Sequence, residues 1–317
     1  MNIAFFWTWE FSKNILNWLL AYKDIKVQFV VSQPDKRAGR KSELQITPLK
    51  QLAIIHDITV LQPEILKKDT SIAKLSKEID FFIVVAYGKI IPLDILNIPK
   101  FGSINLHGSL LPKYRWASPV QESLKNGDDI TGLTTMFMSA WMDEWDILLQ
   151  EKIDINHNDT QIEIFKKFEW IWAHLLYNTL HLIITDDIKP RAQNETHVSY
   201  CKKIEKFDGK IDFTNMTAKQ IYNLYRAYTP WPWIYSEYKW KKMNIEECSY
   251  DDEDIIFDEI FKAGAVCVLE ENEQEKKICI LCKKWILIIK KVKLEWKKTM
   301  NILDFINGNK QFLDYSF

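Results

Sequence analysis

Residues 102–116 read Gly102-Ser-Ile-Asn105-Leu-His107-Gly-Ser-Leu-Leu-Pro-Lys-Tyr-Arg-Trp116, a short apolar strand that carries an Asn and a His into a turn. Side chains at i and i+2 lie on the same face of a strand. If the strand ends at Gly108, Asn105 and His107 lie side by side at the carboxyl edge of a sheet, where open α/β folds bind ligands. An amide donor beside an imidazole can stabilise an oxyanion and move a proton. A structural histidine near a turn is the alternative interpretation of an Asn-x-His taken alone.

The flanking segments predict a parallel sheet. Residues 3–6 form an apolar strand, a helix runs through Phe11, Ile15 and Leu19, and a second strand covers 27–31. This β-α-β order is typical of parallel α/β sheets. Further strands are predicted at 81–86, 103–106 and 133–138, so we expect a Rossmann-like wound, mostly parallel sheet. No glycine-rich dinucleotide or phosphate-loop motif follows any of these strands.

The second half of the chain has a different pattern. Thr160-Gln-Ile-Glu163 is a capping box that opens a long amphipathic helix, and a polar linker follows it. Beyond a helix near 218–225, short apolar runs separated by polar turns predict a small β-barrel. The runs cover 234–238, 255–260, 265–269, 277–281 and 286–292. We therefore predict a first domain at 1–188, a linker at 189–203 and a second domain at 204–317.

The net charge of the chain is close to zero, and two of its segments are rich in basic residues. The net charge of −1 gives no global attraction to nucleic acid, so any such contact must come from local patches. One patch lies in a long loop at 34–48 and the other near the C-terminus. They contain Lys36, Arg37, Arg40 and Lys41, and Lys283, Lys284, Lys290, Lys291, Lys293, Lys297 and Lys298. Such runs are also common on solvated faces.

Five cysteines fit no disulfide framework and indicate a reducing compartment. Cys279-Ile-Leu-Cys282 resembles a metal motif, but in a strand its two thiols point to opposite faces and no second pair completes a zinc site. No basic leader precedes an apolar run at the N-terminus, and no apolar stretch reaches the roughly 18 residues of a membrane helix. We therefore expect a cytoplasmic protein that needs no metal and binds no membrane.

A second motif follows the strand at 133–138. It reads Trp141-Met-Asp143-Glu-Trp145-Asp, so Asp143 can return to the neighbourhood of His107. With the Asn-x-His-x-Ser-Leu-Leu-Pro segment at 105–112, this turn resembles the active-site pattern of the folate-dependent formyltransferases. The resemblance continues through residues 31–40, 84–88, 208–212 and 230–232, and so covers nearly the whole chain. It is strongest for the branch of the family that formylates methionyl initiator tRNA.

The resemblance implies specific roles. Asn105 would donate to the developing oxyanion, while His107 would donate a second hydrogen bond or shuttle the proton. Asp143 would orient the imidazole, raise its basicity or take the proton of the amine through a water, and the sequence does not separate these roles. The co-substrate would be 10-formyltetrahydrofolate, held by the loop that contains Ser109, Leu110, Leu111 and Pro112. Gly108 and Pro112 would also explain this loop as an ordinary turn.

The resemblance also implies the acceptor. In this branch the basic loop enters against the acceptor stem of tRNA, which assigns tRNA contacts to Lys36, Arg37, Arg40 and Lys41, and Arg40 falls on the key arginine. Long cationic side chains on such a loop reach phosphates without a rigid frame. The second domain would be an OB-like barrel that helps to hold tRNA. We expect the protein to act as a monomer.

Two other functions are compatible with the motifs. A formyltransferase acting on an amino-sugar nucleotide shares the catalytic half, although the basic loop and the C-terminal lysines favour tRNA. The hydrolase half of a formyltetrahydrofolate dehydrogenase would need a long C-terminal extension. An inactive RNA-binding homologue is the remaining alternative, if tryptophan genuinely occupies positions where the family carries glycine.

The tryptophan content raises that last question. The chain has 13 tryptophans and only 9 glycines, whereas glycine usually makes up about 7% of a protein. Only Trp231, in Pro-Trp-Pro, matches a tryptophan of the family. Most of the others fall on glycine positions of the family or on turns and helix ends, and Trp116 and Trp145 flank the proposed site. An indole cannot replace glycine where φ is positive. We interpret the pattern as a gene that uses UGA as a glycine codon.

Overall fold

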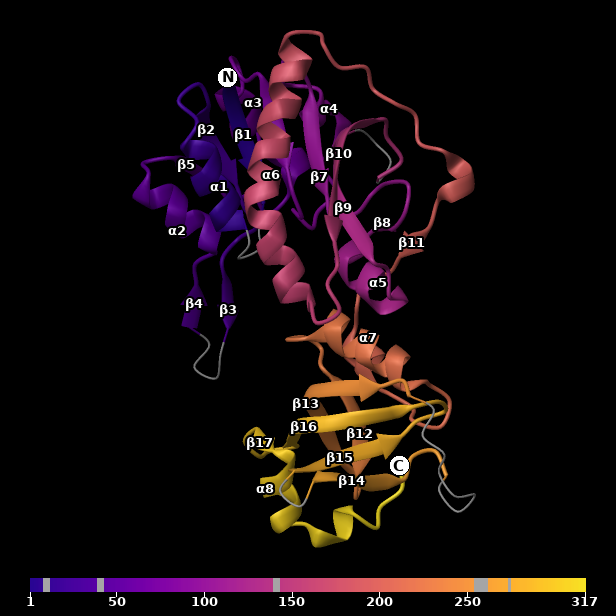
Figure 1. The fold of residues 1–317 in the computed structure, drawn as a ribbon. Coiled ribbons are helices and arrows are strands. Elements are labelled where there is room, and N and C mark those ends of the chain that lie inside the picture. The colour runs from indigo at the N-terminus through magenta and orange to yellow at the C-terminus, as the bar shows by residue number, and fades with distance from the viewer. Residues whose placement is uncertain (8–11, 39–42, 139–142, 254–261, 273–274) are drawn as a thin grey trace. The chain divides into compact units, whose positions relative to one another are not determined.

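In a computed structural model of the protein, the structure describes residues 1–7, 12–38, 43–138, 143–253, 262–272 and 275–317. The chain forms two compact units (Figure 1). The first comprises Met1–Pro119, Ile130–Asp154 and Phe165–Cys201, and the second comprises Val120–Asp129, Ile155–Ile164 and Lys202–Phe317.

The first unit contains a seven-stranded sheet in the order β10-β9-β7-β6-β1-β2-β5. Strands β5, β2, β1, β6 and β7 are parallel, and β9 is antiparallel to both β7 and β10. The sequence prediction of a mostly parallel sheet is confirmed. The strands are β1 (Asn2–Phe6), β2 (Lys26–Val31), β5 (Thr59–Leu61), β6 (Phe81–Val84), β7 (Ser103–His107), β9 (Ile130–Phe137) and β10 (Ile147–Asp154).

Two smaller strand pairs accompany this sheet. The antiparallel hairpin β3 (Lys36–Ala38) and β4 (Glu43–Gln45) lies within 34–48, the segment that we had predicted to be a long loop. All three residues of β4 are exposed, so no apolar alternation in that strand indicated it. The parallel pair β8 (Arg115–Trp116) and β11 (Tyr200–Cys201) joins the residues after the Leu-Leu-Pro loop to the end of the predicted linker.

Helices cover the faces of the large sheet. Figure 1 shows the long helix α6 crossing in front of its strands, and Trp172 of α6 contacts Trp7, which follows β1, with ring centroids 5.6 Å apart. On the other face, Phe6, Phe29 and Phe82 belong to one buried cluster. The α-helices and 3₁₀ turns before residue 200 are α1 (Ser12–Leu20), α2 (Pro48–Ile55), η1 (Leu66–Lys68), α3 (Ser71–Leu75), α4 (Leu93–Leu96), α5 (Pro119–Asn126), α6 (Gln161–Ile184) and η2 (Glu195–His197).

The predicted start of α6 is confirmed. Oε2 of Glu163 accepts a hydrogen bond from the backbone N–H of Thr160 at 3.0 Å. Oγ1 of Thr160 accepts from the backbone N–H of Ile162 at 3.2 Å. These bonds satisfy donors that a helix end otherwise leaves without partners.

The second unit contains an antiparallel sheet in the order β12-β13-β16-β15-β14, with β17 paired to β16. We did not predict its longest strand, β13, although Met243, Ile245 and Cys248 are buried within an otherwise polar run. The predicted strand at 255–260 lies outside the described residues. The elements are η3 (Lys206–Gly209), α7 (Ala218–Tyr228), β12 (Ile234–Tyr238), β13 (Lys241–Asp251), β14 (Val266–Asn272), β15 (Glu275–Leu281), β16 (Ile286–Leu294), β17 (Met300–Asn301), α8 (Ile302–Asn307) and η4 (Lys310–Phe312).

Candidate active site

Asn105 and His107 lie at the carboxyl end of β7, which stands between β6 and β9 in the sheet. His107 is buried, with 6% of its surface exposed, and Asn105 is half-buried. Because they are two residues apart on one strand, their side chains leave the same face. The edge is the one where α/β sheets bind ligands.

Asp143 reaches this pair from the connection between β9 and β10. Its Oδ1 accepts a hydrogen bond from Nδ2 of Asn105 at 3.3 Å, and its Oδ2 lies 3.6 Å from Nδ1 of His107. The backbone N–H of Trp116 donates to the same Oδ2 at 2.8 Å. The structure thus brings together the three side chains that we had selected for catalysis, and their catalytic roles remain a prediction.

The orientation of the His107 ring follows from its second contact. Nε2 lies 2.8 Å from the backbone oxygen of Tyr114. A carbonyl oxygen only accepts, so Nε2 carries a hydrogen and Nδ1 is the nitrogen that faces Asp143. A proton taken up on Nδ1 would point at the carboxylate. This arrangement suits a group that accepts a proton from an attacking amine.

The Ser109–Pro112 loop is fixed by buried and part-buried hydrogen bonds. Oγ of Ser109 donates to the backbone oxygen of Lys113 at 2.5 Å, and the backbone N–H of Leu111 donates to Oγ1 of Thr134 at 3.2 Å. Nε2 of Gln150 donates to the backbone oxygen of Leu111 at 2.9 Å. The polar groups of this loop are therefore used to hold its shape. Of the four residues predicted to bind folate, Ser109 and Leu111 are buried, while Leu110 and Pro112 are half-buried.

Sequence reasoning missed the residues that support this loop. Thr134 is fully buried on β9, where its Oγ1 donates to the backbone oxygen of Ser109 at 2.6 Å. The threonine hydroxyls within this predicted buried strand were a signal, because buried hydroxyls normally have a partner. Gln150 lies on β10, a strand that we had not predicted, so nothing in the sequence pointed to it.

The basic hairpin is anchored at its base. Asp35, just before β3, accepts from Nζ of Lys50 at 2.6 Å and from Nε2 of Gln62 at 2.8 Å. Burial alone would raise the pKa of Asp35, but these hydrogen bonds outweigh it and lower the pKa. Arg37 is exposed on β3. Of the other predicted tRNA-binding residues, Lys36 begins β3, while Arg40 and Lys41 lie outside the described residues.

The C-terminal lysines form an exposed group on and around β16. Two of them are paired with acids of β13, since Nζ of Lys291 lies 2.6 Å from Glu247 and Nζ of Lys293 lies 3.8 Å from Glu246. Exposed ion pairs of this kind contribute little stability. The positive charge available to a phosphate is therefore smaller than the number of lysines suggests.

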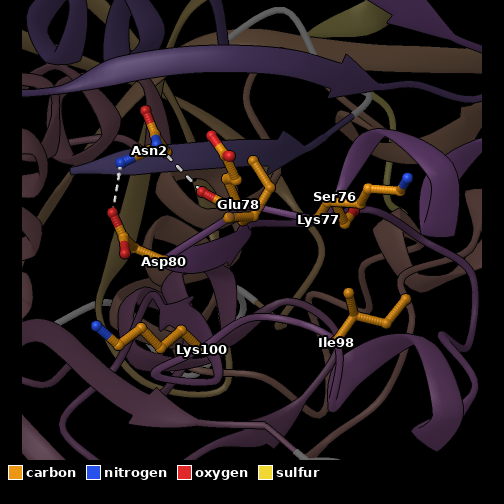
Figure 2. A pocket seen from close by; sticks show the side chains of 8 residues that line it. Asn2, Ser76, Lys77, Glu78, Asp80, Ile98 and Lys100 are labelled. Atoms are coloured by element: carbon orange, nitrogen blue, oxygen red, sulfur yellow. Dashed lines mark hydrogen bonds between the residues drawn. The ribbon is translucent and has the colours of Figure 1, made fainter.

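A separate pocket lies at the opposite edge of the large sheet. It has a volume of about 430 Å³ and is lined by residues that precede or begin β1, β6 and β7 (Figure 2). The backbone N–H of Asn2 donates to Oδ2 of Asp80 at 2.7 Å, and Nδ2 of Asn2 donates to the backbone oxygen of Glu78 at 3.1 Å. These polar groups hold strand ends together at the amino edge, away from Asn105 and His107.

Within the described ranges, no three His, Cys, Asp or Glu side chains gather as metal ligands would. Cys279 and Cys282 are both buried, and Sγ of Cys279 contacts the backbone oxygen of Cys267 at 3.3 Å. No helix among the residues that the structure describes is long and apolar enough to cross a membrane.

The fold, with an Asn, a His and an Asp at the carboxyl edge of its sheet, is compatible with a group-transfer enzyme, and comparison with known proteins identifies the class. Residues 1–179 match the formyl transferase model, and residues 203–310 match that of the formyl transferase C-terminal domain. The chain therefore belongs to the formyl transferase family. Among curated relatives, the methionyl-tRNA formyltransferase of Caldicellulosiruptor saccharolyticus is 39% identical over 312 residues, and that of Clostridium tetani is 37% identical over 312 residues. Both alignments cover 98% of this chain and 97% of the relative.

Solved structures share the fold. WlaRD, a sugar 3N-formyl transferase, matches with a TM-score of 0.63 and 20% identity, over 94% of this chain and 99% of that one. HypX from Aquifex aeolicus matches with a TM-score of 0.62 and 15% identity over 100% of this chain. This chain spans about half of HypX, 48% of its length. At these identities the likeness establishes the architecture alone.

Proposed function

We propose that this protein transfers the formyl group of 10-formyltetrahydrofolate to the α-amino group of methionyl initiator tRNA. The observation that carries the proposal is the meeting of Asn105, His107 and Asp143 at the carboxyl edge of β7. The curated relatives whose alignments cover 97% of their own length are methionyl-tRNA formyltransferases, and this supports methionyl-tRNA as the acceptor. The product would serve translation initiation, and we place the protein in the cytoplasm as a monomer.

The residues suggest how the transfer proceeds. The amine attacks the formyl carbon, and negative charge develops on the formyl oxygen. The Nδ2 group of Asn105 can donate to that oxygen, which lowers the barrier because the donor is already held in place. The amine then loses a proton, for which His107 Nδ1 and the Asp143 carboxylate form adjacent acceptors 3.6 Å apart. Collapse of the adduct breaks the bond between the formyl carbon and the folate nitrogen, and the proton taken from the amine passes to that nitrogen, so that neutral tetrahydrofolate leaves.

The loop Ser109–Pro112 would hold the folate. The half-buried Leu110 and Pro112 offer apolar surface to an aromatic ring, next to the polar groups of the site. When bound, the folate supplies the activated formyl group. HypX has been crystallised with tetrahydrofolic acid, which is compatible with a folate on this fold.

The test compares acceptors. Formyl transfer from 10-formyltetrahydrofolate is measured with charged initiator methionyl-tRNA, charged elongator methionyl-tRNA and a dTDP-linked amino sugar. We expect rapid formylation of the initiator species only. Preferential formylation of the sugar would replace this proposal with the amino-sugar alternative, and tRNA binding without any transfer would identify an inactive RNA-binding homologue. Light scattering of the purified protein tests the monomeric state.

A further inference from the structure

Among the residues that the structure describes, five tryptophans adopt a backbone conformation that favours glycine. In the left-handed region the Cβ of an L-residue crowds the following carbonyl, and glycine avoids this cost. The described glycines that have positive φ span 72° to 97°. The corresponding φ angles are 83° at Trp116, 67° at Trp233, 64° at Trp240, 67° at Trp285 and 63° at Trp296.

The local structures explain why glycine is required. Tyr238 and Lys241 pair across β12 and β13, so Lys239 and Trp240 form a two-residue turn with positive φ at both positions. That geometry is the type I′ turn, which strongly prefers glycine at its second position. Trp240 is 96% exposed and Trp296 is 90% exposed. Burial of the indole therefore offsets none of the conformational cost.

We infer that these five positions carry glycine in the protein made by its host, which reads UGA as glycine. The excess of tryptophan over glycine, 13 against 9, has the same explanation. Trp231 is not among the residues with positive φ. At Trp116 the backbone N–H that holds Asp143 is present whichever side chain the residue carries, so glycine preserves that contact and removes a half-exposed indole from beside the site.

The gene and the native protein test this inference. We expect UGA codons at all five positions, UGG at Trp231, and glycine at the five positions in mass spectra of peptides from the host. A UGG codon at Trp240 or Trp296 would overturn it.

A second measurement tests the backbone conformation alone. In the recombinant chain, Trp240→Gly and Trp296→Gly should each raise Tm. Trp170→Gly is the matched control, because Trp170 is 62% exposed on helix α6, where glycine should lower Tm. Lower Tm for all three would refute the conformational argument.

A separate observation concerns Gln193, in the segment that we had predicted to be a linker. Its Nε2 donates to the backbone oxygen of Asp143 at 2.8 Å and to that of Trp145 at 2.7 Å. Its Oε1 accepts from Nε of Arg115 at 3.1 Å. Arg115 is buried, with 1% of its surface exposed, and its guanidinium also pairs with Glu195 at 2.7 Å.

These contacts hold the turn that presents Asp143. Asp143 has a φ of 59°, a conformation that costs free energy in a non-glycine residue and persists only when its surroundings enforce it. Gln193 secures the main chain of the turn, while the N–H of Trp116 secures the carboxylate. We propose that Gln193 is a positioning residue, which sets the Asp143 carboxylate against His107. This proposal rests on the proposed formyl transfer.

Two substitutions of similar size separate the contacts of Gln193. Gln193→Met loses every hydrogen bond, while Gln193→Glu keeps the acceptor for Arg115 and loses the two donors to the turn. We expect both to lower kcat by about 10-fold or more, because small displacements of a reacting group are costly. Asn194→Ala is the matched control: its side chain caps only Thr196, at 3.1 Å, and its loss should leave kcat unchanged.

Coupling to Asp143 distinguishes positioning from general stability. In an Asp143→Asn background, Gln193→Met should cause no further loss of kcat, and the pH profiles of the two single variants should change in the same way. Full additivity of the two losses, or normal turnover of both Gln193 variants, would overturn the proposal. These assays use a chain with glycine at the five positions and at Trp145, which flanks the proposed site, and the unaltered chain in parallel. If neither parent formylates any acceptor, the proposed function fails instead.

Discussion

The carboxylate of Asp143 lies 3.6 Å from Nδ1 of His107, while Nε2 of the same ring is committed to the backbone oxygen of Tyr114. The imidazole is thus held at one nitrogen and faces an acid with the other. Such a pair can take up and release one proton without moving. Asn105, His107 and Asp143 therefore have different roles in the proposed mechanism, and each role can be tested by substitution.

Removal of any of the three polar side chains should slow catalysis. We expect Asn105→Ala, His107→Ala and Asp143→Ala each to lower kcat by roughly 10² or more, since each removes an oxyanion donor or a proton acceptor. The measurement is steady-state formylation of methionyl-tRNA, with tRNA binding followed separately. Binding should persist in all three. Near-normal turnover in one variant would remove that residue from the mechanism.

The basic hairpin should contribute to tRNA binding through charge. Arg37→Ala and Arg40→Ala should weaken methionyl-tRNA binding and reduce its salt dependence. A variant that makes one phosphate contact fewer releases fewer counterions when it binds. The KM for folate should be unchanged. Lys100→Ala, at the amino edge of the sheet, removes the same charge and serves as the control. An unaltered salt slope would mean that the hairpin is only solvated.

Gly132 should be essential for the folate loop. A Cβ at this position would lie 2.2 Å from the backbone oxygen of Glu151 and 2.5 Å from Cδ2 of Leu110. Because backbone cannot move aside easily, Gly132→Ala should separate β9 from β10, displace Leu110, lower Tm and raise the KM for folate. Gly308→Ala is the control, since its nearest contact would be at 3.8 Å. An unchanged KM would show that Leu110 does not contact the folate.

Asp212 should stabilise the second unit at neutral pH and lose this effect in acid. Hydrogen bonds from Asn215 and Thr214 lower the pKa of Asp212 from 3.8 to about 2. A carboxyl with a lowered pKa in the folded state stabilises the protein above its ordinary pKa, and this stabilisation is lost as the pH falls toward the folded value. The Tm difference between the parent and Asp212→Ala should be constant above about pH 5 and shrink between pH 4 and pH 2. A difference independent of pH would contradict the ionic origin.

Much of this protein could be predicted from local patterns. Period-two alternation placed Asn105 and His107 on one face of a strand, and the capping box placed the start of α6, because both depend on residues close in sequence. The motif around Asp143 indicated a return to the same edge. In β13 the alternation begun by Met243 and Ile245 is broken where the pairing with β16 is irregular, so that the next buried residue is Cys248 and no simple period-two pattern indicated the strand.

Only the tertiary structure decided how the site is supported. Gln193 meets Asp143 across 50 residues of sequence, and Gln150 meets Leu111 across 39. No local propensity encodes such pairs, since each forms only when separate segments pack together and a buried carbonyl must find a donor. The left-handed backbone at Trp240 is likewise set by the pairing of β12 with β13. The sequence determined which chemical groups are present, while the packing of distant segments determined which of them are held in place.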